Sequence, residues 1–288
     1  MVILANHMME VQVHPLGAEL HGLKNLRSGI QHLWSGDPAF WGKRSPVLFP
    51  IVGSLLNGCY AYKGTWHSMG RHGFAREKPF TAAVHGPSRA TFTLTDDEQT
   101  RIVYPFAFVL QLEYSLEGER LTVTYRVTNP ADRPMYFSIG GHPAFAVPYV
   151  DGLRYEDHYL EFESRETVGR KLLHEGLLAD GEEAFLLDSR RVDLHPSLFE
   201  RDAVVLQGLK SEYLELRTSL SPHGIRFGIA DWPHLGLWAA RGAPFLCIEP
   251  WQGHADPTGH DGDLTRKPGI VELGPYADWE RSWWVETF

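Results

Sequence analysis

The sequence is poor in cysteine and in basic residues, and it has no long apolar segment. Its two cysteines, Cys59 and Cys247, cannot build a disulfide framework and are typical of isolated thiols in a reducing cytoplasm. No apolar run approaches the ~18–20 residues that a membrane helix needs, and the longest candidate, residues 47–56, is interrupted by a proline and a glycine. Residues 1–9 lack the basic segment and the apolar stretch of a signal peptide. We therefore expect a cytoplasmic protein without a membrane partner.

The low content of basic residues also limits the classes of partner. Lys and Arg number 27 against 36 Asp and Glu, so the formal net charge is −9. Neutralisation of phosphates dominates nucleic-acid affinity, and because the chain has no clustered basic stripe we expect no nucleic-acid partner. The 288 residues are 43% hydrophobic and 12% aromatic, which is ample material for a core. Since no linker or repeat divides the chain, we expect residues 1–288 to form a single domain. No feature predicts an oligomeric state.

Alternation of apolar and polar residues dominates the chain, whereas helical periodicity is scarce. In residues 121–128 every odd position is apolar and every even one polar. A similar stripe runs through residues 106–114, and weaker ones occupy residues 90–95, 159–163, 213–217, 225–229 and 235–239. Turn signals separate these segments, at residues 117–119, 129–130, 180–181 and 221–224. The pattern predicts an all-β protein, a large antiparallel β-sandwich or barrel, with one helical turn at residues 196–201.

Three segments interrupt this pattern with residues that carry chemistry. Residues 69–76 hold His72 among glycines and arginines, residues 139–145 hold His142, and Glu249 ends an apolar run. An ionised carboxylate there is costly unless it is paired, hydrogen-bonded or used. Each feature also has a structural explanation, because a histidine beside Gly or Pro is commonly a turn residue and a terminal Glu can form a salt bridge. Spacing alone does not bring the segments together.

Four segments in register resemble the aldose 1-epimerase (galactose mutarotase-like) superfamily, and most closely its LacX-type branch. The matching residues are SPVLFPIVG at 45–53, RHGFAR at 71–76, GHPAF at 141–145, and IEPW at 248–251 with Gly253 and Asp256. The resemblance implies a β-supersandwich and a small-molecule sugar as substrate. It further implies interconversion of the α and β anomers of a hexose without a metal or other cofactor.

Mutarotation requires one acid and one base. The anomeric O1 hydroxyl loses a proton while the ring oxygen O5 gains one, the ring opens to the aldehyde, the C1–C2 bond rotates, and closure follows on the other carbonyl face. A positioned base and a positioned acid suffice for this chemistry. The resemblance implies that Glu249 is the base at O1 and His142 the acid at O5. It implies that His72 donates a hydrogen bond at or near O5.

Further residues are candidates for substrate binding. Asp202 lies where the family often has an aspartate that binds sugar hydroxyls, although a solvated turn residue is the alternative. Trp251 can stack on the apolar face of a sugar or pack in the core. Arg71 belongs to the same motif as His72 and is a further candidate.

Arg76 has two interpretations. Its guanidinium can bind a hydroxyl or, in a sugar-phosphate relative, a phosphate; alternatively, it pairs with Glu77 or Asp256. The chain also departs from many relatives at Ser54, where they carry a basic residue. This departure implies a different hydroxyl pattern in the substrate, or a substitute such as Arg44.

A metal site is not expected. Residues 254–263 contain several His and Asp residues, but their spacing matches no zinc or calcium loop, and Gly, Pro and Asp commonly make turns.

Three other functions stay open beside a mutarotase of free aldoses. The same reaction on a hexose 6-phosphate is one, although the acidic net charge argues against an anionic substrate. A non-catalytic carbohydrate-binding protein is another, but it would not need Glu249, His142 and His72 together. A glycoside hydrolase is the third, but it needs two carboxylates. Only Glu249 is a strong candidate, and Asp202 or Asp256 would have to be the second carboxylate.

Overall fold

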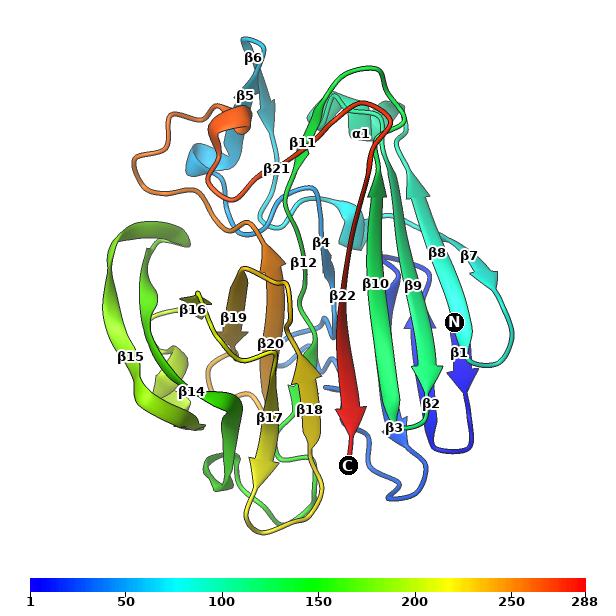
Figure 1. The fold of residues 1–288 in the computed structure, drawn as a ribbon, viewed down its shortest axis with the longest axis vertical. Coiled ribbons are helices and arrows are strands. Elements are labelled where there is room, and N and C mark those ends of the chain that lie inside the picture. Colours follow the sequence, from blue (N-terminus) through cyan, green and yellow to red (C-terminus); the bar gives the residue numbers. More distant parts are fainter.

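Antiparallel strands make up nearly all of the regular secondary structure in the computed structural model, which describes residues 1–288 (Figure 1). The expected all-β class is therefore confirmed. The α-helix α1 (Glu98–Val103) was not predicted, because it is too short to show helical periodicity. Its start is fixed locally, since the Asp97 carboxylate accepts a hydrogen bond from the Thr100 backbone N–H. No helix of the structure has the length and apolar character needed to cross a membrane.

One long sheet runs through the molecule. Its strands lie in the order β4-β12-β20-β19-β16-β14-β17-β18-β22-β10-β9-β8-β7, with β13 paired to β20 and β15 to β14. The bounds are β4 (Val47–Leu48), β7 (Thr81–Val84), β8 (Arg89–Thr95), β9 (Val109–Glu117), β10 (Arg120–Thr128), β12 (Ile139–Gly141), β13 (Ala144–Ala146), β14 (His158–His174), β15 (Leu177–Asp193), β16 (Val204–Gln207), β17 (Tyr213–Thr218), β18 (Ile225–Gly228), β19 (His234–Trp238), β20 (Phe245–Gln252) and β22 (Asp278–Thr287).

Smaller sheets cover parts of this long one. The strands β1 (Val2–Ala5), β2 (Met9–His14) and β3 (Glu19–Asn25) form a layer behind β8–β10 (Figure 1). The two layers share one apolar core, and the Tyr114 hydroxyl of β9 donates to the Ala18 carbonyl at 2.7 Å. The remaining pairs are β5 (Cys59–Tyr62) with β6 (Thr65–Ser68) and β11 (Met135–Phe137) with β21 (Val271–Leu273).

The alternating segments of the sequence are strands with one buried face. In β10 the apolar odd positions are buried, as the pattern predicts, and the weaker stripes become β8, β14, β17, β18 and β19. The stripe at residues 106–114 begins later than predicted, because β9 starts at Val109 while Phe106 and Phe108 are buried ahead of it. A 3-10 turn occupies Pro196–Phe199, where one helical turn was predicted.

The hairpin of β14 and β15 differs from the prediction. Residues 180–181 were predicted to form a turn, but they lie inside β15, and the turn is at Glu175 and Gly176, whose φ angles are 51° and 78°. The strand predicted at residues 159–163 continues to His174. Its outer half is mostly half-buried and has no alternating apolar stripe, so the sequence pattern could not predict this extension. The tip is bound to a neighbouring loop, since the Leu178 N–H donates to the Asp256 backbone carbonyl and the Leu178 carbonyl accepts from the Thr258 N–H, both at 2.9 Å.

Strand β20 carries two different faces into the interior. Leu246 and Ile248 join the main core, whereas Cys247 and Trp251 belong to two small separate clusters. Successive side chains of a strand alternate between faces, so Glu249 points to the same side as Cys247 and Trp251. The face of β20 that carries Cys247, Glu249 and Trp251 forms the base of the candidate site.

Candidate active site

A cavity of about 220 Å³ lies over this face of β20. All the predicted site residues except Asp202 line it, together with Trp41, Trp238 and Ala203. The fold therefore brings together the segments around His72, His142 and Glu249, whose convergence their spacing could not predict.

Glu249 lies on the floor of the cavity and is 1% exposed. The Trp251 indole N–H donates to its carboxylate at 3.2 Å. Burial raises the pKa of Glu249 to about 8, and the nearby Arg71 cation opposes this shift. Glycine at position 236 makes room for the Trp251 ring, since a Cβ there would lie 2.5 Å from Trp251 Cζ2.

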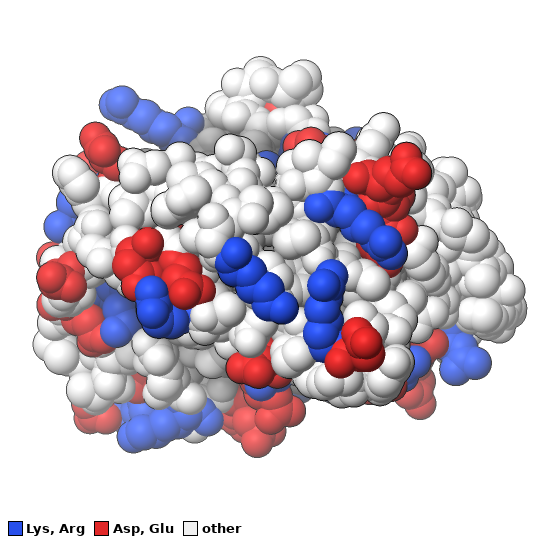
Figure 2. Space-filling model, turned by 90° about the horizontal axis from the view of Figure 1, so that it is seen from above, with Lys and Arg blue, Asp and Glu red and all other residues white.

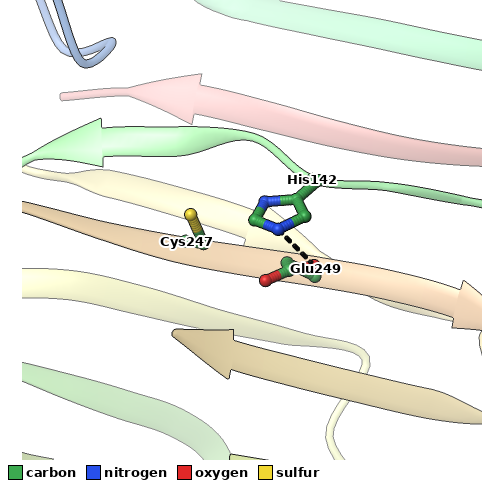
Figure 3. A group of neighbouring side chains, drawn as sticks. All are labelled: His142, Cys247 and Glu249. Atoms are coloured by element: carbon green, nitrogen blue, oxygen red, sulfur yellow. Dashed lines mark ion pairs between the residues drawn. The ribbon is translucent and has the colours of Figure 1, made fainter. Parts of the chain in front are cut away.

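His142 faces Glu249 from the connection between β12 and β13. Its Nε2 lies 3.3 Å from Glu249 Oε2 (Figure 3). The imidazole stacks on Trp41 at 4.9 Å and meets the edge of Trp238 at 5.7 Å between ring centroids. Burial lowers the pKa of His142 to about 3. At neutral pH the free site therefore has a proton on Glu249 and a neutral imidazole beside it.

His72 is held in one orientation by the backbone. Its φ of 68° is left-handed, and its Nδ1 accepts a hydrogen bond from the Gly53 N–H at 3.0 Å. Burial and the neighbouring His142 and Arg71 keep the pKa of His72 well below its usual value, so the ring is neutral. A neutral imidazole has one N–H, and we assign it to Nε2 because Nδ1 is the acceptor.

His72 and Arg71 meet at the wall of the cavity. Arg71 Nε lies 3.2 Å from His72 Nε2, with its N–H directed at this ring nitrogen. Because Nδ1 already faces the Gly53 N–H, both ring nitrogens face donors, and a neutral ring can accept from only one of them. Since both side chains line the cavity, the N–H that is left without an acceptor is available to an oxygen of a ligand.

The arginines have no close carboxylate partner. Arg76 donates from Nη2 to the Arg71 carbonyl at 2.8 Å, its Nε is buried without a partner, and its contact with the exposed Glu77 is 3.8 Å. Arg71 has no ion-pair partner. The alternative pairing of Arg76 with Asp256 is wrong, because Asp256 binds Lys267 at 2.6 Å.

Asp202 lies at the edge of the site. Its φ is 113° and its carboxylate accepts from the Ala203 N–H at 2.7 Å, as in a turn residue. It is near enough to contribute to the raised pKa of Glu249. Contact with a sugar stays a prediction.

The positive charge near Ser54 comes from Arg71 and not from Arg44, the substitute that the sequence suggested. Arg44 donates to the His21 carbonyl at 2.7 Å and does not line the cavity. Arg71 Nη1 and Ser54 Oγ instead both border Gly176 at the hairpin tip, 3.7 and 3.4 Å from the place of a Cβ there. Arg71 therefore supplies positive charge on this side of the site.

Trp41 and Trp238 are site residues that the sequence did not predict. Both pack against the His142 ring and line the cavity. With nine tryptophans in the chain and no distinguishing motif around these two, their sequence carries no signal of this role.

The Asp-rich segment 254–263 has a structural role at Asp256. This fully buried carboxylate accepts from Lys267 Nζ at 2.6 Å and from the Leu56 N–H at 2.9 Å. It thereby joins the segments that flank the site.

We expect Lys267→Met to lower the free energy of unfolding by about 3–5 kcal/mol, because the variant leaves the Asp256 charge buried with one partner fewer. Urea unfolding measures this loss. Lys63→Met, at an exposed position, is the control and should change stability little. A loss below about 1 kcal/mol in Lys267→Met would show that the pair is dispensable.

Three comparisons place the chain among known proteins. The family model described as aldose 1-epimerase matches residues 1–269. The plasmid-encoded protein LacX of Lactococcus lactis subsp. lactis is 33% identical over 290 aligned residues, which cover 97% of each chain. A galactose mutarotase related enzyme from Lactobacillus acidophilus is similar in structure, with a TM-score of 0.95, 34% identity and coverage of 100% of this chain and 97% of that one.

A galactose mutarotase-like protein from Lactobacillus casei has a TM-score of 0.94 and 29% identity, with full coverage of both chains. The supersandwich architecture implied by the sequence motifs is thus confirmed. The chain belongs to the aldose 1-epimerase family.

Proposed function

We propose that the protein is a mutarotase that interconverts the α and β anomers of a hexose in the cavity over β20. The observation that supports this proposal best is the buried contact of 3.3 Å between His142 Nε2 and Glu249 Oε2 at the cavity floor. An acid and a base side by side are what ring opening and closure require.

The pair has the correct number of protons for this reaction. Transfer of the Glu249 proton to His142 Nε2 gives a carboxylate and an imidazolium without any exchange with solvent. Burial disfavours both charges, so this ionised pair is a stronger base and a stronger acid than the same groups in water. When Glu249 takes the proton from O1 and His142 protonates O5, the pair returns to the neutral state that burial favours. Ring closure reverses both transfers.

The remaining cavity residues hold the sugar. His72 and Arg71 lie side by side on the cavity wall, and we assign to them the binding of O5 or of a neighbouring hydroxyl. The indoles of Trp41, Trp238 and Trp251 provide apolar faces for the C–H groups of the ring.

Exchange spectroscopy by NMR tests the proposal with galactose, glucose and their 6-phosphates. Galactose comes first because the Lactobacillus acidophilus relative is described as related to galactose mutarotase. We expect exchange between anomers above the spontaneous rate for at least one sugar. Binding without acceleration, seen as line broadening, would instead support a carbohydrate-binding protein.

We expect kcat/KM to fall as the pH rises through about 8. Below that pH the pair keeps the proton that Glu249 holds with its raised pKa, and above it the proton is lost and no acid remains for O5. Because the pKa of His142 is about 3, the pH–rate profile should show no inflection near the ordinary histidine value of about 6.5. Rates measured between pH 5 and 9 check this, and a limb centred near 6.5 would contradict it.

A hexose 6-phosphate is the second candidate substrate. It is favoured by Arg71 and Arg76, which bring two cations without close carboxylate partners to one cavity. Faster exchange of the 6-phosphates, with competitive inhibition by sulfate, would establish this preference. Equal rates with the free sugars and no effect of sulfate would exclude it.

A further inference from the structure

One nucleophilic group beside the acid–base pair has no part in the proposed reaction. Cys247 is a free cysteine, completely buried, two residues before Glu249 on β20. Figure 3 shows the Cys247 sulfur beside the His142 ring, with the Glu249 carboxylate below the ring. The site therefore combines a thiol, an imidazole and a carboxylate.

The spacing of these groups suits one ion. A ligand atom from each of His142, Cys247 and Glu249 lies within 4.8 Å of the other two. Zn²⁺ binds nitrogen and oxygen at about 2.0–2.2 Å and sulfur at about 2.3 Å, so tetrahedral ligands lie about 3.3–3.7 Å apart. The His142–Glu249 contact of 3.3 Å already has this separation. The other two separations are 4.8 Å or less, so a movement of the thiol by about 1.5 Å or less completes the set.

The donor set selects the metal by its chemistry. Thiolate with imidazole favours Zn²⁺, Co²⁺ and Cd²⁺, whereas Mg²⁺ and Ca²⁺ need oxygen ligands. Three protein ligands leave a fourth position free, and two of the three, His142 and Glu249, line the cavity. Binding releases the thiol proton and the proton that the pair shares, because metal ligands must be deprotonated.

We propose that His142, Cys247 and Glu249 form a Zn²⁺ site whose occupation inhibits the protein. The ion takes the lone pairs of Glu249 Oε2 and His142 Nε2, so neither can exchange a proton with a sugar. The inhibitory effect rests on the proposed mutarotase function; metal binding itself does not.

Titration with Co²⁺ tests the binding site without any assay of activity. The chelator-treated protein should bind one equivalent and develop the thiolate-to-cobalt charge-transfer absorption in the near ultraviolet. Cys247→Ala and Cys247→Ser should lose this band, whereas Cys59→Ala, which removes the other cysteine, should keep it. Absence of the band in the wild type, or its survival in both Cys247 variants, would overturn the proposal.

Competition by Zn²⁺ then gives the affinity. Loss of a direct ligand is expected to weaken binding at least about 100-fold, since loss of a supporting partner alone costs about 10–100-fold. Glu249→Gln provides a second route if the cysteine variants fold poorly: it should keep the absorption band but bind Zn²⁺ more weakly. Unchanged affinity in Glu249→Gln would contradict the assigned ligand set.

The effect on anomer exchange is measured separately. Zn²⁺ should stop exchange in the wild type over the range in which it binds, EDTA should restore it, and Cys247→Ala should remain active at these concentrations. Exchange that persists at saturating Zn²⁺ would overturn the inhibition. A cobalt band in a protein that exchanges no sugar would leave the metal site standing and refute the mutarotase.

Discussion

Glu249→Gln is expected to slow anomer exchange by about 10²–10⁴-fold while leaving sugar affinity within a few fold. The amide has the shape of the carboxyl group and can still accept from the Trp251 indole N–H, which now donates at 3.2 Å. It cannot take a proton from O1, so the loss falls on kcat. Exchange spectroscopy gives the rate, and line broadening or calorimetry gives the affinity.

Glu117→Gln is the matched control, because Glu117 is an exposed residue at the end of β9. It should behave as the wild type. A Glu249→Gln protein with normal activity would remove Glu249 from the mechanism, and with it the pairing on which the proposed function rests.

His142→Asn is expected to lose a similar factor, about 10²–10⁴, and to reverse the slope of the pH profile. In the wild type the active pair needs its proton, so the rate falls through the raised pKa of Glu249, about 8. In the variant no acid is left at O5, and the residual rate depends on ionised Glu249 alone. That rate should rise with pH until the carboxyl group is fully ionised.

The control for this variant is His7→Asn, at an exposed position. A His142→Asn profile that still falls above pH 8 would show that another group supplies the proton to O5. His72, which contacts the His142 ring at 5.7 Å between centroids, would be the first alternative.

Alternation was sufficient to predict the strands in which one face is solvated. It worked for β10, whose buried positions are the apolar ones. It failed in β15 because the outer half of the long hairpin has little core beneath it, so no apolar pattern marks the pairing that extends past residues 180–181. Periodicity reports burial, and a strand without a buried face has no pattern to report.

The site could be predicted in part because its chemistry is local. Each of His72, His142 and Glu249 interrupts a strand pattern in its own segment, and the motifs around them are specific. Trp41 and Trp238 could not be found, since their role comes only from packing against His142. The proximity of Arg71 to Ser54 could not be predicted either. Both border Gly176, and their meeting there depends on where the tip of the β14–β15 hairpin is bound.

The alternation of β20 also makes activity a probe of folding. A slip of one residue against β19 would turn Glu249 into the core and expose Ile248 in the cavity, although the number of backbone hydrogen bonds would barely change. Circular dichroism would record both arrangements as sheet. The time at which anomer exchange recovers during refolding would therefore show when β20 reaches its native register. Circular dichroism would show separately when secondary structure appears.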